Sequence, residues 1–161
     1  MQESQMKDYD IKIKKAEEVT IYGTDNDTIV VPSQVNFETN RNQAEIDIDG
    51  VAKALIGIPP KADHIELFIE NSVLNLQGIS FNRMEIDGEG KLYIALEDAD
   101  GSIDVNMIHG EAELIVPSGF SFATRCEGKN NVIDCKIHTD PSAKNVIELN
   151  GKNSVLTIRN K

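Results

Sequence analysis

Carboxylate side chains recur at a regular spacing along this 161-residue chain. Four of them follow one another at steps of nineteen residues: Asp47, Glu66, Glu85 and Asp104. Ala123 and Glu148 occupy the next equivalent positions. Carboxylate oxygens are the ligands that hard cations such as calcium prefer. The spacing therefore predicts an acidic strip that binds either cations or a basic partner. Calcium is the cation that such a strip would bind as a cofactor. A solvated face that prevents aggregation would show the same pattern.

The histidines and the most acidic loop lack the spacing of metal sites. His64, His109 and His138 fall in three separate turns, without the short intervals of a zinc triad. The segment Glu97–Asp104 looks like a calcium loop, but an EF-hand alignment on Gly101 puts apolar Leu96 and Met107 at positions that need oxygen ligands. We expect a glycine turn between strands at this segment.

Nucleophilic and redox residues give no catalytic pattern either. Ser118 lacks the flanks of a nucleophile elbow, and no glycine-rich loop opens a helix. Cys126 and Cys135 both fall at inward positions, either as small buried side chains or as a pair that could meet across the core in an oxidising compartment. The sequence predicts no catalytic and no cofactor-binding residues, and a protein that is not an enzyme.

Charge excludes two classes of partner. Twenty-seven acidic residues against sixteen Lys and Arg give a net charge of −11, which disfavours nucleic acid and anionic membrane surfaces. No apolar run reaches the roughly 18 residues of a membrane span, so no membrane insertion is predicted. The start at Met1 is polar and carries no secretory apolar region. We expect a cytoplasmic location if Met1 is the native start, whereas an excerpt of a longer precursor could come from any compartment.

Apolar residues that recur in columns indicate the elements that position these side chains. One pair of columns, with steps of nineteen, is Ile46, Ile65, Met84, Ile103, Phe122 and Ile48, Leu67, Ile86, Val105, Thr124. The other, with steps of twenty or twenty-one, is Ala54, Leu74, Ile94, Leu114, Cys135, Leu156 and Ile56, Leu76, Leu96, Val116, Ile137, Ile158. Members of a pair lie two residues apart, as on one face of a β-strand.

The period predicts a single all-β domain over residues 1–161, built from about eight coils with two short strands each. Ile11/Ile13, Ile29/Val31, Val19/Ile21 and Val35/Phe37 extend the columns upstream with looser spacing, so residues 1–45 form less regular coils. The polar, proline-containing segment 138–144 is predicted to be a loop insertion.

Two architectures satisfy this periodicity. A parallel β-solenoid stacks each strand on its equivalent one coil away, about 4.8 Å distant. An antiparallel sandwich or barrel places each strand beside its neighbour in sequence. The solenoid is favoured, because it stacks equivalent residues of successive coils on one another, as the columns of similar residues indicate.

Outward positions on the second pair of strands carry less charge. They are Leu55, Asn75, Ala95, Ile115, Lys136 and Thr157. Leu55, Ala95 and Ile115 are apolar where water is expected, which predicts an interaction face for self-association or a partner. Scattered exposed apolar side chains are the alternative.

Between Ala54 and Val132 the sequence resembles the bacterial putative-adhesin family of β-strand-repeat domains. The matching text is E-N-S-V-L-N-L-Q-G-I, M-E-I-D-G-E-G-K-L-Y-I, D-G-S-I-D-V, G-E-A-E-L-I-V-P and S-G-F-S-F, in that order. The resemblance implies a right-handed, parallel β-helix-like fold, no catalytic residues and association with the bacterial cell surface or envelope. This chain departs from the family in having no signal or anchor.

Together these patterns predict a non-catalytic bacterial binding or structural module, adhesin-like, with an unknown protein or carbohydrate ligand. The alternative is an intracellular scaffold that self-associates end to end or through its apolar face. A polysaccharide-acting enzyme is a remote alternative, because its paired carboxylates would have to flank a cleft.

Overall fold

The computed structural model describes residues 7–25, 27–98 and 100–161, and it is all-β, as predicted. Its thirteen strands form one open sheet. Their bounds are β1 Asp8–Lys14, β2 Glu18–Gly23, β3 Asn36–Asn40, β4 Gln43–Asp49, β5 Lys53–Ile58, β6 His64–Gln77, β7 Arg83–Ala95, β8 Ser102–Ile108, β9 Glu111–Val116, β10 Ala123–Cys126, β11 Val132–Cys135, β12 Val146–Lys152 and β13 Val155–Asn160. Within the described ranges there is no helix long and apolar enough to cross a membrane.

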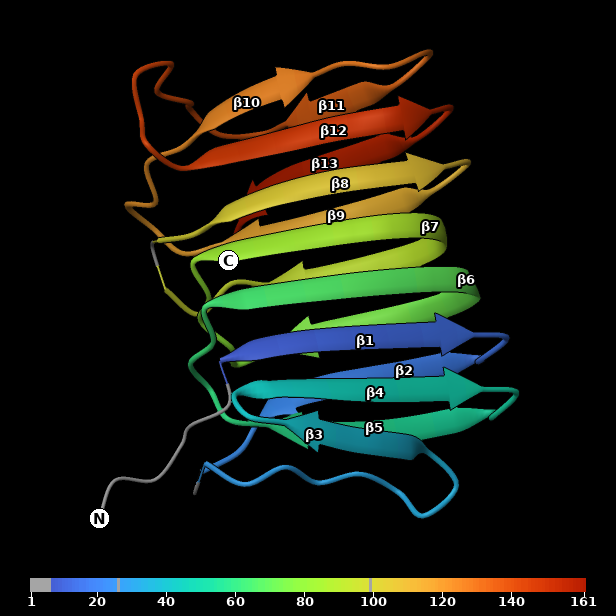
Figure 1. The fold of residues 1–161 in the computed structure, drawn as a ribbon. Coiled ribbons are helices and arrows are strands. Elements are labelled where there is room, and N and C mark those ends of the chain that lie inside the picture. The colour runs from blue at the N-terminus through green and yellow to red at the C-terminus, as the bar shows by residue number, and fades with distance from the viewer. Residues whose placement is uncertain (1–6, 26, 99) are drawn as a thin grey trace.

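Parallel pairing dominates the sheet. Of its twelve strand pairings eleven are parallel, and the pair β3–β4 is antiparallel. Each turn of the chain, here called a coil, supplies one strand to a front row (β3, β4, β1, β6, β7, β8, β12, β10) and one to a back row (β5, β2, β6, β7, β9, β13, β11). β6 and β7 are long enough to bend round the corner and belong to both rows. Figure 1 shows the resulting stack.

The coils do not stack in sequence order. From the β3 end upward the order is β4/β5, β1/β2, β6, β7, β8/β9, β12/β13 and β10/β11. The first coil of the chain thus lies between the second coil and β6, and the last coil lies between β8/β9 and β10/β11 (Figure 1). The described residues form seven such coils, one fewer than the predicted number.

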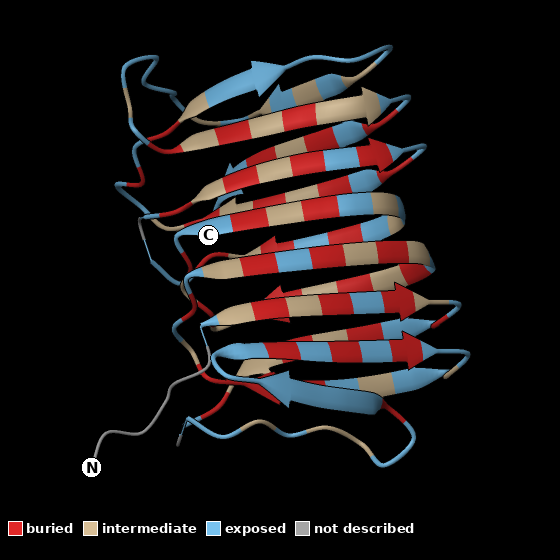
Figure 2. Ribbon diagram, in the orientation of Figure 1, coloured by how far each residue is buried: buried red, intermediate tan, exposed pale blue. Residues whose placement is uncertain are grey.

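The core runs the length of the stack between the two rows. Its two central columns are Ile46, Ile11, Leu67, Ile86, Val105, Leu149 in front and Ile56, Ile21, Leu76, Ile94, Leu114, Ile158 behind. None of these side chains is more than 2% exposed. Figure 2 shows buried residues alternating with more exposed ones along the strands, because successive side chains point to opposite faces.

Corners between front and back strands explain the repeated Asn-Ser pair of the sequence. Asn71 and Asn153 adopt positive φ angles of 51° and 55°, a conformation that asparagine tolerates better than most residues. The serine that follows each is buried and bonds to the neighbouring coil. The Ser72 hydroxyl accepts the N–H of Ala16 at 3.0 Å, and the Ser154 hydroxyl accepts the N–H of Gly110 at 3.0 Å. The motif therefore links coils at the turn.

The corner of β7 is tighter than that of β6. Gly88 and Gly90 have φ angles of +121° and +141°, and a Cβ on Gly88 would collide with the carbonyl oxygen of Ile69. The register between β6 and β7 shifts between Glu70 and Ser72, so Asn71 is an extra residue on the β6 side. Leu74 consequently pairs with Leu92, two residues before the Ile94 that the columns predicted.

Residues predicted as a coil near the N-terminus instead cover the end of the stack. Val30 makes an antiparallel bridge to Gly57 at the edge of β5, and Phe37 in β3 pairs antiparallel with Ile46. Ile29/Val31 and Val35/Phe37 are therefore not equivalent to the other strand pairs. The reason is that a parallel stack ends in an unpaired edge, which an antiparallel strand can close.

The opposite end of the stack is formed by β10 and β11. Cys126 and Cys135 continue the two core columns there, paired with Leu149 and Ile158. Both are free thiols; Cys126 is exposed and Cys135 half-buried. The interpretation of both cysteines as buried is thus wrong for Cys126, because no further coil lies over it among the described residues. The predicted loop at 138–144 joins β11 to β12 outside any strand.

Candidate functional site: an acidic row on the front face

A single row of outward carboxylates crosses the front face from coil to coil. Parallel pairing places them side by side in the order Glu45, Asp10, Glu66, Glu85, Asp104 and Glu148. Arg125 of β10 follows Glu148 and ends the row. Adjacent parallel strands lie about 4.8 Å apart, so six consecutive coils each present one carboxylate to solvent at nearly the same interval. We call these six residues the acidic row.

The structure brings together four of the residues expected in this strip. Glu66, Glu85 and Asp104 are direct neighbours, and Glu148 follows. Asp47 lies in the adjacent row, where it pairs with Lys12 of β1. The nineteen-residue step fails at Asp47 because β1 separates β4 from β6 and because Ile46 aligns with Leu67, through Ile11, rather than with Ile65.

Ala123 does not continue the row either. It pairs with Val146, and Arg125 occupies the position beside Glu148. Through Glu148 of β12, Asp104 thus aligns with Arg125, two residues beyond Ala123.

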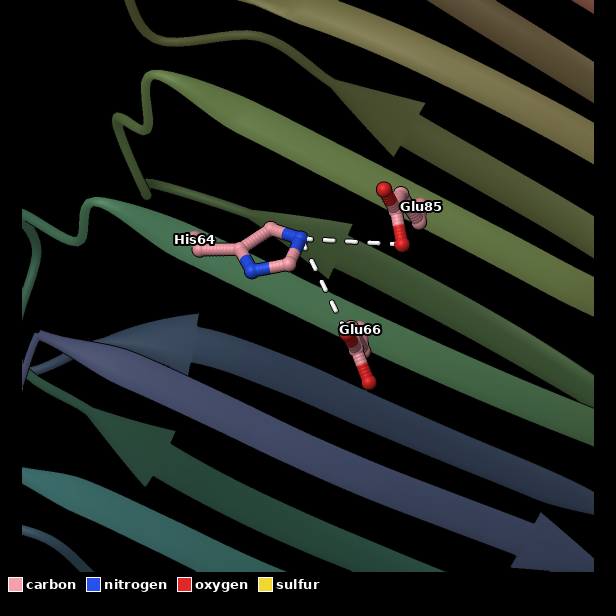
Figure 3. Close-up of side chains that lie close together, drawn as sticks. All are labelled: His64, Glu66 and Glu85. Carbon is pink, nitrogen blue, oxygen red and sulfur yellow. Dashed lines mark ion pairs between the residues drawn. The ribbon is translucent and has the colours of Figure 1, made fainter.

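A histidine and two arginines contact the row from its edge. His64 Nε2 lies 3.7 Å from Glu85 Oε2 and 4.0 Å from Glu66 Oε1 (Figure 3). Arg83 Nε donates to Glu85 Oε1 at 3.0 Å. Arg125 Nη1 lies 3.2 Å from Glu148 Oε1. Glu85 is therefore bound from two sides, whereas Glu66 meets His64 at the limit of an ion pair.

His64, Glu66 and Glu85 also have the donor set of a divalent-metal site. One ligand atom from each lies within 4.8 Å of the other two, and imidazole with carboxylates suits ions such as zinc. Arg83 already occupies one oxygen of Glu85, and His64 Nε2 makes no hydrogen bond. The geometry therefore admits a cation but is equally an ion-pair cluster.

Asp104 is the most strongly perturbed carboxylate of the row. Burial is the largest cause that raises its pKa, and the negative charges of Glu148 and Glu85 add to it, whereas the Asn150 hydrogen bond and Arg83 oppose the rise. Its Oδ1 is buried and makes no hydrogen bond. Asp104 thus carries its charge at a cost that a bound cation would offset.

Two hollows lie on this side of the molecule, and row residues line the smaller one. One of about 240 Å³ is lined by Arg83, Asp104, Arg125 and Glu148, among others. The other, of about 550 Å³, lies at the corner, where Gly88 and Gly151 leave the backbone uncovered between Phe68 and Ile108. Both hollows are open to solvent.

The apolar interaction face expected on the back strands is not continuous. Ala95 and Ile115 are paired neighbours and half-buried, but Leu55 lies in the next row, at the far end of the stack. The row of Leu55 continues through Thr20, Asn75, Tyr93 and Glu113. The columns predicted a step of twenty residues between Leu74 and its partner, but with the extra residue Asn71 the step in the back row is eighteen.

Asp10, Glu45, Arg83 and Arg125 are members of this site that the sequence patterns did not identify. A usable signal existed for Arg83 and also for His64, since each lies two residues before a row carboxylate and so shares its face of the strand. Asp10 and Glu45 carry no comparable signal, because their place in the row depends on the order in which the coils stack.

Comparison with known proteins supports the fold. No family model and no curated protein matches this sequence. A solved structure described as a "putative cell adhesion protein" from Clostridium sporogenes superposes with a TM-score of 0.70 over 98% of this chain and 94% of its own, at 11% sequence identity. At this identity the likeness shows a shared fold, and that neighbour is named for adhesion rather than for an enzymatic activity.

Proposed function

We propose that this chain is a non-catalytic, adhesin-like binding module of a bacterial cell surface, and that the acidic row is its binding surface. The ligand class is a basic segment of a partner protein, whose Lys or Arg side chains meet the carboxylates along the row. The observation that carries the proposal is the run of carboxylates on six consecutive coils.

The physical basis is alignment of charges on a rigid support. Like charges directly opposite one another on adjacent strands disfavour the folded state, and each neighbour adds about 1 kcal/mol in water before salt screening. A cationic chain laid along the row would relieve this repulsion. Strands that are hydrogen-bonded on both sides keep the spacing fixed, so little conformational freedom is lost on binding.

Support for a non-enzymatic role comes from the shape of the face and from the structural neighbour. The acidic side chains stand in a line on an open surface, whereas glycoside hydrolysis needs two carboxyl groups at a set separation across a substrate. The neighbour from Clostridium sporogenes carries the name of an adhesion protein.

Binding of an oligolysine peptide, measured by calorimetry at low and at physiological salt, tests the proposal. A triple variant, Glu66→Gln with Glu85→Gln and Asp104→Asn, should bind about tenfold more weakly, because each exposed charge pair contributes roughly 0.2–1 kcal/mol. The affinity of the native chain should fall as salt rises.

The matched control removes the same charge elsewhere. Glu17, Glu18 and Glu97 are exposed and lie outside the row, so the variant with Gln at all three keeps the acidic row intact. It should bind oligolysine nearly as tightly as the native chain. Equal weakening in both triple variants would show that only net charge matters and would overturn the proposal.

Calcium is a second ligand that the raised pKa of Asp104 favours. If calcium binds beside Glu85 and Asp104, millimolar calcium should raise the melting temperature, because a ligand that binds only the folded state stabilises it. The rise should shrink in Glu85→Gln. A melting temperature that stays constant with added calcium would exclude this ligand.

A further inference from the structure

The two ends of the stack are closed to different degrees. At the β3 end the core side chains Ile46 and Ile56 are completely buried, beneath β3 and the segment that bridges Val30 to Gly57. At the β10 end the equivalent positions are Cys126, which is exposed, and Cys135, which is half-buried. Stacked-repeat domains need a polar cap on their terminal repeats to stay soluble. In the part of the chain that the structure describes, only the β3 end has one.

Backbone groups are left without strand partners at the same end. Ala123, Glu127 and Lys129 donate their N–H groups to Asn145, Leu149 and Gly151. Alternate residues of a strand direct these groups to opposite sides. Thr124, Cys126 and Gly128 therefore direct theirs away from β12, and β10 pairs with no other described strand.

β11 repeats this arrangement on the back row. Val132 and Lys136 donate to Ser154 and Ile158 of the coil beneath, so Ile133 and Cys135 direct their backbone groups outward. Val132, 53% exposed, adds an apolar side chain beside this edge. The outer edges of β10 and β11 are thus both free to extend the sheet.

If a two-fold axis relates two copies of the chain, charged residues on each of these edges lie opposite residues of opposite charge on the same edge of the other copy. Antiparallel pairing of β10 with its own copy, centred on Cys126, places Arg125 opposite Glu127 of the second copy. The same axis passes β11 near Cys135 and places Asp134 opposite Lys136 of the second copy. Pairing centred on Cys126 and Cys135 also lets the two copies exchange backbone hydrogen bonds, because the N–H and C=O groups of these two residues face outward.

We propose that the β10 end is a dimer interface, at which a second copy of this chain adds its β10 and β11 antiparallel to those of the first. An interface of this kind uses the same patch on both subunits and closes on itself. It would bury the open end of both cores and leave the two β3 caps outermost, so the dimer cannot grow into a fibre. The inference is independent of the ligand of the acidic row.

Charge reversal tests the interface, with the association state measured by analytical ultracentrifugation. Glu127→Arg should weaken the dimer at least tenfold, because Arg125 of each copy would then face a positive charge on the other copy in place of a carboxylate. Adding Arg125→Glu to it should restore dimerisation. Glu38→Arg on exposed β3 is the matched control and should leave the dimer unchanged.

Amide hydrogen exchange gives a second measurement on the native chain. The N–H groups of Thr124, Cys126 and Ile133 should become protected as protein concentration rises, whereas those of β3 should not. A chain that stays monomeric at its highest soluble concentration would overturn the proposal. So would a dimer that Glu38→Arg abolishes, or an assembly that grows beyond two subunits.

Discussion

At the scale of single residues, Asp104 shows how the acidic row is balanced. Its carboxylate lies between Glu85 and Glu148 on neighbouring strands, and one of its oxygens is buried without a hydrogen bond. Arg83 and Arg125 bind the two glutamates that flank it. Arginines therefore neutralise the neighbours of Asp104, while Asp104 itself keeps one buried oxygen without a hydrogen bond.

The raised pKa of Asp104 sets a direction for the pH dependence of stability. Between its ordinary value of 3.8 and its higher folded value, the folded chain binds more protons than the unfolded chain. The stability that protonated Asp104 provides is thus present at low pH and is lost as pH rises through this window. At neutral pH Asp104→Asn should be more stable than the native chain and melt at a higher temperature. The gain in the free energy of unfolding should be on the order of 1 kcal/mol, the repulsion of a neighbouring like charge.

The difference between the two proteins should shrink as pH falls to and below 3.8, the ordinary pKa of an aspartate, because Asp104 of the native chain takes up a proton. Melting followed by circular dichroism across this range measures it. Glu97→Gln, which removes an exposed charge outside the row, should show no such pH-dependent gain. Destabilisation of Asp104→Asn at neutral pH would contradict this description of the site.

At the scale of elements, the corners hold neighbouring coils in register. The Ser154 hydroxyl accepts the N–H of Gly110 and donates to the carbonyl oxygens of Met107 and Lys152. Since Ser154 is only 1% exposed, water cannot replace these bonds. The Asn-Ser pairs are thus structural, and they account for the similarity between the segments around residues 71 and 153.

Ser154→Ala should lower the free energy of unfolding by about 1–3 kcal/mol, because it leaves the buried N–H of Gly110 without a partner. Urea denaturation measures the change. Ser118→Ala, at an exposed turn position, should have almost no effect. Equal losses from both substitutions would show that the corner hydroxyl has no special role.

Strand positions could be predicted well where consecutive segments of sequence are also consecutive coils. Ile65, Met84 and Ile103 pair as the columns predicted, and Glu66, Glu85 and Asp104 follow from them. The prediction was wrong where one residue more or less at a corner shifts the register, as Asn71 does. Such a difference is a property of turn geometry and leaves no trace in apolar periodicity.

At the scale of the whole molecule, the order of the coils decides which residues meet. Asp10 and Glu45 belong to the acidic row only because β1 is inserted between β4 and β6. The sequence contains no signal for this insertion, since β1 carries the same alternation as any other strand and fits equally well at several levels of the stack. Which coils form the ends of the stack, and hence which residues make up the full acidic row, could be determined only from the structure.

The first and the last described strands are both internal to the stack. β1 and β13 each have a strand on both sides: β1 pairs with β4 and β6, and β13 pairs with β9 and β11. The outermost coils are therefore made by internal segments.

Disulfide trapping tests the unbroken acidic row most directly. In a background with Cys126→Ser and Cys135→Ser, the pair Asp10→Cys with Glu66→Cys should oxidise readily, because adjacent parallel strands lie about 4.8 Å apart and disulfides need Cα atoms within about 4.4–6.8 Å. Asp47→Cys with Glu66→Cys, which β1 separates in this stack but which would be direct neighbours if the coils stacked in sequence order, should stay reduced, as judged by thiol titration. Rapid oxidation of the second pair, with the first remaining reduced, would mean that the coils stack in sequence order and would contradict the row.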